Sequence, residues 1–282
     1  MAAKIDAFLK GSTNLPALPN MIGKLLTALD NQAFSTAKLS QIIATDTSLS
    51  ARVLKMANSV FYFRMEKIAT VDTAAVRLGR KTIRSLVLTV WTQTFKSLRQ
   101  QDGELGLVSK LLEHGTATAV GASLLIKPLH AGLAEEAYVA GLLHDIGQLA
   151  LACQLGRCYE NDVLARLASE QKMILAVENK VLGFDHAMLG ERLLKSWNIP
   201  SESVKAAARH HEPAVDPAAD PVVAAVALAD ELASRKWGSE LGYMPRSHVD
   251  EMLKYFRITD LPVLEEQWNQ RLLSLQEALA TL

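Results

Sequence analysis

The stretch Ala140-Gly141-Leu142-Leu143-His144-Asp145-Ile146-Gly147-Gln148-Leu149 stands near the middle of the chain, and its apolar residues predict a helix that packs on more than one side. His144 and Asp145 lie next to each other in the middle of this stretch. Charged side chains are rarely buried without a partner, because removing a lone charge from water is costly. A metal ion would be such a partner, provided that other segments supply the remaining ligands.

Apolar residues recur at helical spacing on both sides of this stretch and along most of the chain. Val, Ile and Thr do not gather into alternating runs, so the sequence predicts an all-α protein. Short helices are expected in the first third, and one continuous helix is expected over 135–155. Three residues are expected to be N-caps of the short helices, and Gly79 is expected to close the last of them. The expected N-caps are Ser35, Asp46 and Asp72.

The composition limits the classes of function. The 282 residues are 49% hydrophobic and carry 30 basic and 30 acidic side chains, so we expect neither a general nucleic-acid binder nor a membrane protein. A basic cluster around Gly79 is expected to be a solvated helix face, and the alternative is a phosphate or nucleic-acid contact. Two cysteines are too few for a disulfide framework, and with no signal peptide at the start they indicate a cytoplasmic protein. The basic cluster consists of Arg77, Arg80, Lys81 and Arg84.

The polar segment 98–106 is the expected lobe boundary. It divides the chain into an N-terminal helical lobe over 1–100 and a helical core over 101–236, and further helices follow over 237–282. The core contains the His-Asp pair together with most of the histidines, so any metal site is expected there.

Five of the seven histidines form an ordered series with two aspartates, each in an apolar helical stretch or at a helix end. One such histidine is more often a hydrogen-bonded core residue than a ligand, and His130 and His248 are expected to be ordinary loop or surface residues. The ordered series favours metal binding. The candidate ligands are His114, His144, Asp145, His186, His210, His211 and Asp230.

Imidazole and carboxylate ligands favour a divalent transition ion such as Fe, Mn, Zn or Ni. One ion could be bound by His114, His144, Asp145 and Asp230, and a second by His186, His210 and His211. The carboxylate of Asp145 would then bridge the two ions. A pair of ions roughly 3.5–4 Å apart can orient a phosphate for in-line attack.

These residues also carry a resemblance. His114, His144-Asp145 and Asp230 resemble the defining residues of the HD superfamily of metal-dependent phosphohydrolases, and the whole set resembles the HD-GYP branch. Other motifs make about 15–212 similar to the HDOD family. They are Leu15-Pro16-x-Leu18-Pro19, Ile42-Ile43-x-x-Asp46, Ala57-Asn58-Ser59, Gly141 to Gly147, Gly183-Phe184-Asp185-His186 and Trp197-Asn198-Ile199-Pro200. The HDOD resemblance implies a bacterial, all-helical signalling module in which an N-terminal lobe packs on an HD-type core.

Two departures from the HD-GYP pattern argue against hydrolysis of cyclic dinucleotides. Gln148 stands where HD-GYP enzymes carry a phosphate-binding lysine, and no Gly-Tyr-Pro motif follows His210-His211. The sequence therefore predicts a cytoplasmic regulatory module that retains the metal site and acts with signalling proteins. The alternative is a metal-dependent phosphohydrolase for a nucleotide or another phosphate ester. In that alternative a metal-bound hydroxide is the nucleophile, and no side chain is assigned a catalytic role.

Overall fold

The structure is a computed structural model, and the residues it describes are almost all helical. None of them forms a strand, so the predicted all-α class is confirmed. The predictions at 15–19, at Ser35 and over most of 98–106 lie outside the described residues. The described residues are 2–12, 20–30, 36–59, 62, 67–98, 105–170, 173–212, 215–237 and 244–280.

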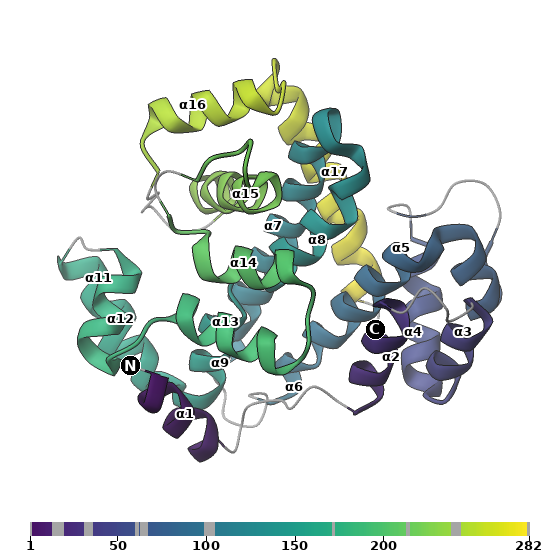
Figure 1. The fold of residues 1–282 in the computed structure, drawn as a ribbon, viewed down its shortest axis with the longest axis horizontal. Coiled ribbons are helices and arrows are strands. Elements are labelled where there is room, and N and C mark those ends of the chain that lie inside the picture. The colour runs from purple at the N-terminus through teal and green to yellow at the C-terminus, as the bar shows by residue number, and fades with distance from the viewer. Residues whose placement is uncertain are drawn as a thin grey trace.

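Four helices pack together at the right of Figure 1 and contain most of the described residues of the predicted N-terminal lobe. Their apolar faces meet around Leu25, Ile43 and Val53, which are fully buried. As predicted, Asp46 caps one helix, because its side chain accepts a hydrogen bond of 2.9 Å from the backbone N–H of Leu49. The helices are α2 (Asn20–Asp30), α3 (Thr36–Ala44), α4 (Thr47–Ala57) and α5 (Val71–Gln93).

Helix α5 joins this lobe to the rest of the molecule. It changes direction at Gly79, whose φ of 79° lies in the region that favours glycine. The helix end predicted at Gly79 is therefore a kink, after which the helix continues to Gln93. The predicted N-cap Asp72 is wrong. Thr70 is the cap instead, because its extended backbone lets its hydroxyl accept from the N–H of Thr73. As a whole, α5 packs on the other helices of the lobe and also on helices of the core.

Asn58 fixes the loop that follows α4. Its amide donates to the carbonyls of Leu54 and Ile68, both at 2.8 Å, and its oxygen accepts from the N–H of Ile68 at 2.7 Å. We expect Asn58→Ala to lower the free energy of unfolding by about 2 kcal/mol, because it leaves three backbone groups without this partner. Chemical denaturation measures the loss. The control is Ser59→Ala, because the Ser59 hydroxyl makes no hydrogen bond to the described residues. A similar loss in both variants would contradict this role for Asn58.

The core is built from six helices that surround one region near the centre of Figure 1. Helices α7, α8 and α15 pack against one another, while α13 packs on α9 and α14. Their buried surfaces are rich in alanine and valine, which lets the helix axes approach closely. The six are α7 (Leu105–His130), α8 (Ala134–Leu143), α9 (Ile146–Leu155), α13 (His186–Ser196), α14 (Ser201–Arg209) and α15 (Pro221–Trp237).

The continuous helix predicted over 135–155 is wrong, because two helices meet at the His-Asp pair. Helix α8 ends at His144, and Asp145 has φ −99° and ψ 20°, outside the helical range. Helix α9 begins after this turn, with the N–H of Leu149 donating to the carbonyl of Asp145 at 2.9 Å. The turn leaves the His-Asp pair at a corner between two helices, where Nε2 of His144 lies 3.3 Å from Oδ2 of Asp145.

Both chain ends pack on the core. The indole of Trp268 in α17 (Leu261–Ala280) lies over Gly121 in α7 and donates to the carbonyl of Ala117 at 2.9 Å. Helix α1 (Ala2–Gly11) packs on the core through an edge-to-face contact of Phe8 with Phe184. The boundaries at 100 and 236 stay predictions. The remaining elements are α6 (Phe95–Leu98), η2 (Ala131–Leu133), α10 (Arg157–Tyr159), η3 (Glu160–Leu164), α11 (Ala165–Glu170), α12 (Ile174–Leu182) and α16 (Arg246–Tyr255).

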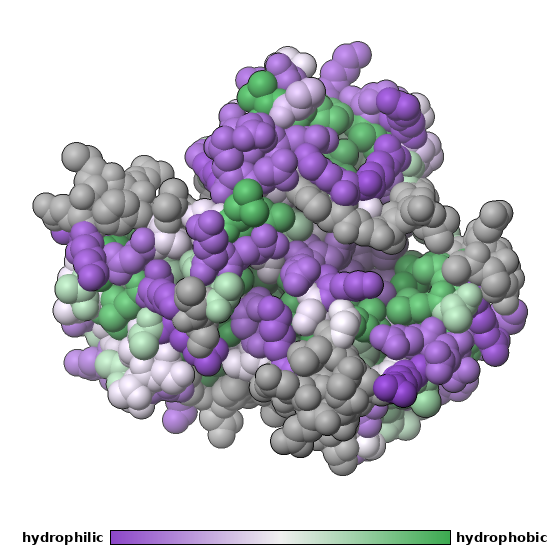
Figure 2. Space-filling model, turned by 180° about the vertical axis from the view of Figure 1, so that it is seen from behind, coloured by the Kyte–Doolittle hydropathy of each residue, from purple (hydrophilic) through white to green (hydrophobic). Residues whose placement is uncertain are grey.

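One apolar stretch, Gly106–Leu155, satisfies the length and composition of a membrane span. Three core helices divide it, and half of its most apolar window is buried. This is weak evidence for a membrane, because core helices pass the same test. Figure 2 shows the opposite face of the molecule, where polar residues cover much of the surface and hydrophobic residues gather in separate small areas.

Candidate metal centre

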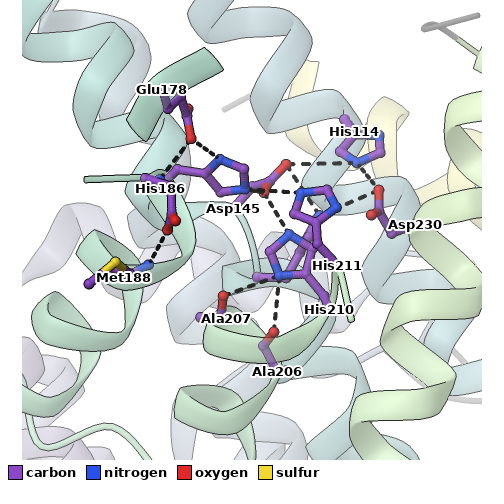
Figure 3. A network of polar contacts seen from close by, with 12 residues as sticks. His114, Asp145, Glu178, His186, Met188, Ala206, Ala207, His210, His211 and Asp230 are labelled. Atoms are coloured by element: carbon purple, nitrogen blue, oxygen red, sulfur yellow. Dashed lines mark hydrogen bonds and ion pairs between the residues drawn. The ribbon is translucent and has the colours of Figure 1, made fainter. Parts of the chain in front are cut away.

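Seven side chains from five core helices and their ends converge in the interior of the core (Figure 3). They form two neighbouring groups of potential ligands, and within each group the ligand atoms lie within 4.8 Å of one another. The seven are the residues predicted from the sequence, although they are spread over 117 positions of the chain, from 114 to 230. The first group is His114, His144 and Asp230; the second is Asp145, His186, His210 and His211.

The first group joins α7, the end of α8, and α15. Nε2 of His114 is 2.8 Å from Oδ1 of Asp230, and Nε2 of His144 is 3.7 Å from the same oxygen. Helices α7 and α8 approach closely here, because a methyl group on Gly141 would lie 2.9 Å from Cα of Ala119. Glycine at position 141 therefore lets the two histidine-bearing helices pack side by side.

The second group joins the corner at Asp145 to α13 and to the end of α14. Oδ1 of Asp145 is 3.4 Å from Nε2 of His186 and 3.3 Å from Nε2 of His210. Nε2 of His211 is 3.1 Å from Nε2 of His186. Two ligands of one ion, each ~2.1 Å from it and at an angle of 90–109°, are themselves about 3.0–3.4 Å apart, so the spacing of this group suits a single ion.

Asp145 lies between the two groups. Its Oδ1 faces His186 and His210, while its Oδ2 is 3.3 Å from Nε2 of His144 and 4.0 Å from Nε2 of His114. One oxygen is therefore presented to each group. This is the arrangement that a bridging carboxylate requires.

Three of the histidines are held so that Nε2 faces the cluster. Nδ1 of His144 lies 2.7 Å from the carbonyl of Gly141, and Nδ1 of His210 lies 3.0 Å from that of Ala206. Nδ1 of His186 lies 2.7 Å from the carboxylate of Glu178. Because carbonyl and carboxylate oxygens only accept, each Nδ1 carries the hydrogen, and the lone pair of the neutral ring is on Nε2. Metal-binding histidines are typically oriented in this way.

Two buried atoms in the cluster lack a hydrogen bond. Within the described part of the chain, neither Nε2 of His144 nor Oδ1 of Asp145 has a partner of hydrogen-bond geometry. A buried polar atom without a partner is costly, and both atoms lie among the candidate ligands, with Nε2 of His144 3.7 Å from Oδ1 of Asp230 and Oδ1 of Asp145 3.3 Å from Nε2 of His210. Their chemistry, imidazole nitrogen and carboxylate oxygen, suits a divalent transition ion, which would satisfy both. The residues present therefore fit a metal.

Helices α9 and α13 touch through their backbones beside the second group. A methyl group on Gly147 would overlap the carbonyl oxygen of His186, and it would lie 2.7 Å from the backbone nitrogen of Gly190. Gly147 follows Asp145 by two positions. Glycine at this crossing is what allows the carboxylate of Asp145 and the ring of His186 to come within contact of each other.

Glu178 is a residue of the site that the sequence analysis missed. It is fully buried in α12, and it accepts hydrogen bonds from the backbone N–H and from Nδ1 of His186, at 2.8 and 2.7 Å. The chain reverses at Gly183, whose φ is 82°, and Asp185 then caps α13, which brings His186 back beside Glu178. Glu178 lies at helical spacing from the apolar residues Ile174, Val177 and Val181. Its place on this apolar face is the sequence signal by which it could have been found.

The charges in the cluster shift one another's pKa values. Burial alone would raise the pKa of Asp145, but His144 and then the other histidines hold it well below its usual range. Burial would lower the pKa of His186, but the carboxylates of Glu178 and Asp145 outweigh it and raise the pKa to about 9. The pKa of His211 is lowered well below its usual value by burial and by His210 and His186. Asp145 is therefore ionised, and His211 is neutral.

The other sequence candidates lie outside the cluster. His130 contacts Tyr255, and His248 contacts Glu251. In the basic cluster around Gly79, Arg80 donates to the carbonyl of Ala28 at 2.8 Å, and Lys81 pairs with Glu136 at 2.6 Å. These two side chains therefore pack against the protein's own helices.

Comparison with known proteins identifies the family. Residues 15–213 match the HDOD domain. The chain belongs to the HDOD family. This match spans the described helices of the N-terminal lobe and most of the core, including six of the seven clustered residues; Asp230 lies beyond it. The resemblance recognised in the sequence motifs is thereby confirmed.

Solved structures share the fold of this HDOD protein. An HDOD domain protein of unknown function from Geobacter sulfurreducens is 21% identical, covers 98% of this chain and 97% of its own, and has a TM-score of 0.75. A protein from Shewanella amazonensis named as a candidate phosphohydrolase is 24% identical, with coverage of 99% and 97% and a TM-score of 0.70. At these identities the likeness establishes the fold alone.

A relative is also found among curated proteins. An uncharacterized protein of Treponema pallidum (strain Nichols) is 23% identical over 253 residues, which are 87% of this chain and 46% of that protein. The HDOD chain thus spans less than half the length of this relative.

Proposed function

We propose that this HDOD protein is a cytoplasmic bacterial signalling module that binds one or two divalent transition ions, of Fe, Mn, Zn or Ni, at the His/Asp cluster. In this role the ions stabilise the core or make the module sensitive to a ligand, and partner signalling proteins bind its surface. A structure of similar fold from Marinobacter aquaeolei, 21% identical with a TM-score of 0.71, is named as a candidate signal transduction protein.

The proposal rests on one observation, the position of Asp145 between two groups of histidines. Each of its oxygens faces imidazole Nε2 atoms of a different group, at 3.3 Å from His144 on one side and 3.3 Å from His210 on the other. A core that merely tolerated histidines would satisfy these nitrogens with protein hydrogen bonds. Here they converge on carboxylates instead, which supports a site for cations.

The helix that carries His144 also contacts the N-terminal lobe, which supports a signalling role. The hydroxyl of Ser85 in α5 donates to Glu135 in α8 at 2.6 Å, and the hydroxyls of Thr89 and Tyr138 lie 3.0 Å apart. Helix α8 then runs directly to His144. A shift of α8 on ion or ligand binding would therefore reach the lobe surface.

A metal-dependent phosphohydrolase of nucleotides or other phosphate esters is the second candidate, favoured by the accessibility of the cluster. The side chains of His114 and Asp145 are 22% and 14% exposed, so part of the cluster is accessible to solvent. Bound ions would supply an activated water there. The chain's own part would be to hold the ions through the seven ligands. Gln148 is 8% exposed and sits where a phosphate-binding lysine would be needed, which disfavours cyclic dinucleotides.

Metal analysis tests the proposal. Protein purified without chelator is expected to contain one or two equivalents of a transition metal, and protein stripped by chelator is expected to gain thermal stability when Mn²⁺, Fe²⁺, Ni²⁺ or Zn²⁺ is added. No bound metal and no stabilisation would overturn both candidate functions. A phosphatase and phosphodiesterase screen of the loaded protein separates the two: turnover that disappears in Asp145→Ala favours the enzyme.

Metal affinity is expected to rise with pH. Because the pKa of His186 is raised to about 9, its ring stays protonated at neutral pH in the metal-free protein, and an ion must displace that proton. As the pH is lowered from 8 to 6, the apparent affinity for Mn²⁺ should therefore fall about tenfold per pH unit for each proton that the ion displaces. Calorimetric titrations in buffers of different ionisation enthalpy count the protons released. An affinity that is constant over this range would contradict the assignment of His186 as a ligand.

A further inference from the structure

Glu178 accepts three hydrogen bonds from described residues. The backbone N–H and Nδ1 of His186 both donate to Oε2, and the hydroxyl of Tyr159 donates to Oε1. All three residues are almost completely buried. A carboxylate suits this place because both of its oxygens accept, whereas an amide would turn an N–H toward one of the donors.

Tyr159 is itself held in one orientation. Its buried hydroxyl donates to Oε1 of Glu178. Burial and then the charge of Glu178 raise the pKa of Tyr159 well above its usual value, so the hydroxyl stays protonated and donates. The hydrogen bonds therefore run in order from Tyr159 through Glu178 to His186.

We propose that Glu178, held by Tyr159, is the positioning residue of the second ligand group: it fixes the ring of His186 so that Nε2 faces Asp145, and it thereby sets the affinity of that group alone for its ion. The inference rests on the proposed function. A carboxylate that accepts a hydrogen bond from Nδ1–H also makes the imidazole a stronger metal ligand, as in other carboxylate-histidine-metal arrangements.

The first group should be independent of this support. His144 is oriented by the carbonyl of Gly141, and His114 contacts Asp230 directly. Within the described residues, no hydrogen bond of Tyr159 or Glu178 reaches these three ligands. Loss of Glu178 should therefore weaken one ion and spare the other.

The test is a titration of the chelator-stripped full chain with Co²⁺, followed by calorimetry and by visible absorption, which reports the ligands of each ion. Glu178→Gln is expected to weaken one of two bound ions by about 10–100-fold and to leave the other close to wild type. Tyr159→Phe should weaken the same ion by a smaller factor. Tyr138→Phe is the matched control, because its buried hydroxyl contacts Thr89 away from the cluster.

A second measurement needs no metal. In the ¹⁵N-histidine NMR spectrum of the stripped protein, the Nδ1–H proton of His186 is expected far downfield. The signal is assigned by its absence in His186→Ala. In Glu178→Gln it is expected to shift upfield or vanish. Equal weakening of both ions, unchanged binding, or the same effect in Tyr138→Phe would overturn the inference while leaving the proposed function intact. A wild-type chain that binds no Co²⁺ would overturn the proposed function as well.

Discussion

Asp145→Ala is expected to abolish measurable binding of both ions, with a loss of affinity of at least about 100-fold at each group. A support residue outside the ligand set typically costs 10–100-fold, and a shared ligand should cost more. The reason is its position: one oxygen lies 3.3 Å from Nε2 of His144, and the other lies 3.3 Å from Nε2 of His210. No other described carboxylate of the cluster faces both groups. Metal content and calorimetric titration measure the loss.

Two further variants make this result interpretable. Asp145→Asn keeps the shape of the side chain and removes its charge, so it should also lose both ions. Asp46→Ala removes a helix cap in the N-terminal lobe, which costs about 1 kcal/mol of stability and leaves the cluster intact. It should therefore bind metal like the wild type. An Asp145→Ala protein that folds and retains one ion at wild-type affinity would show that the carboxylate does not bridge.

Gly147→Ala is expected to destabilise the protein by about 3 kcal/mol, near the upper end for overpacked sites. The added methyl group would overlap the carbonyl oxygen of His186 and crowd the backbone nitrogen of Gly190. Both are main-chain atoms of α13, so no side chain can rotate away, and the two helices must separate. The separation would move His186 away from Asp145, and we therefore expect weaker ion binding in whatever fraction still folds.

The control for this variant is Gly106→Ala, also a helical glycine. Nothing lies within 4 Å of the methyl group it would gain, so it should be neutral or stabilise by up to about 1 kcal/mol. Chemical denaturation of the two variants, with and without Mn²⁺, separates crowding from the general effect of alanine in a helix. A Gly147→Ala protein as stable as Gly106→Ala would contradict the close packing of α9 on α13.

Much of the candidate site could be predicted because ligand identity is local chemistry. His114, His186 and Asp230 each stand out as polar residues within apolar helical stretches, and their order along the chain resembles a known family. The HDOD motifs at Ala57-Asn58-Ser59 and around His144 carry the same information. The helical class follows from periodicity alone.

Other features could not be predicted because they depend on how distant helices pack. The helix expected over 135–155 breaks at Asp145, and periodicity does not detect this because both halves are buried on all sides. Glu178 could not be assigned either. Its role exists only because the turn at Gly183 returns the chain to it, and its second partner, Tyr159, comes from another helix.

The sequence by itself determined the helical class, the family and the types of candidate ligand, since these depend on residue identity and on spacing within single helices. Only the tertiary structure decided that Asp145 presents one oxygen to each group and that Glu178, bonded to Tyr159, lies beside His186. Distances between side chains 116 positions apart, such as His114 and Asp230, are set by the close contact of helices at small residues. That contact depends on the packing of the whole core, which no local pattern in the sequence specifies.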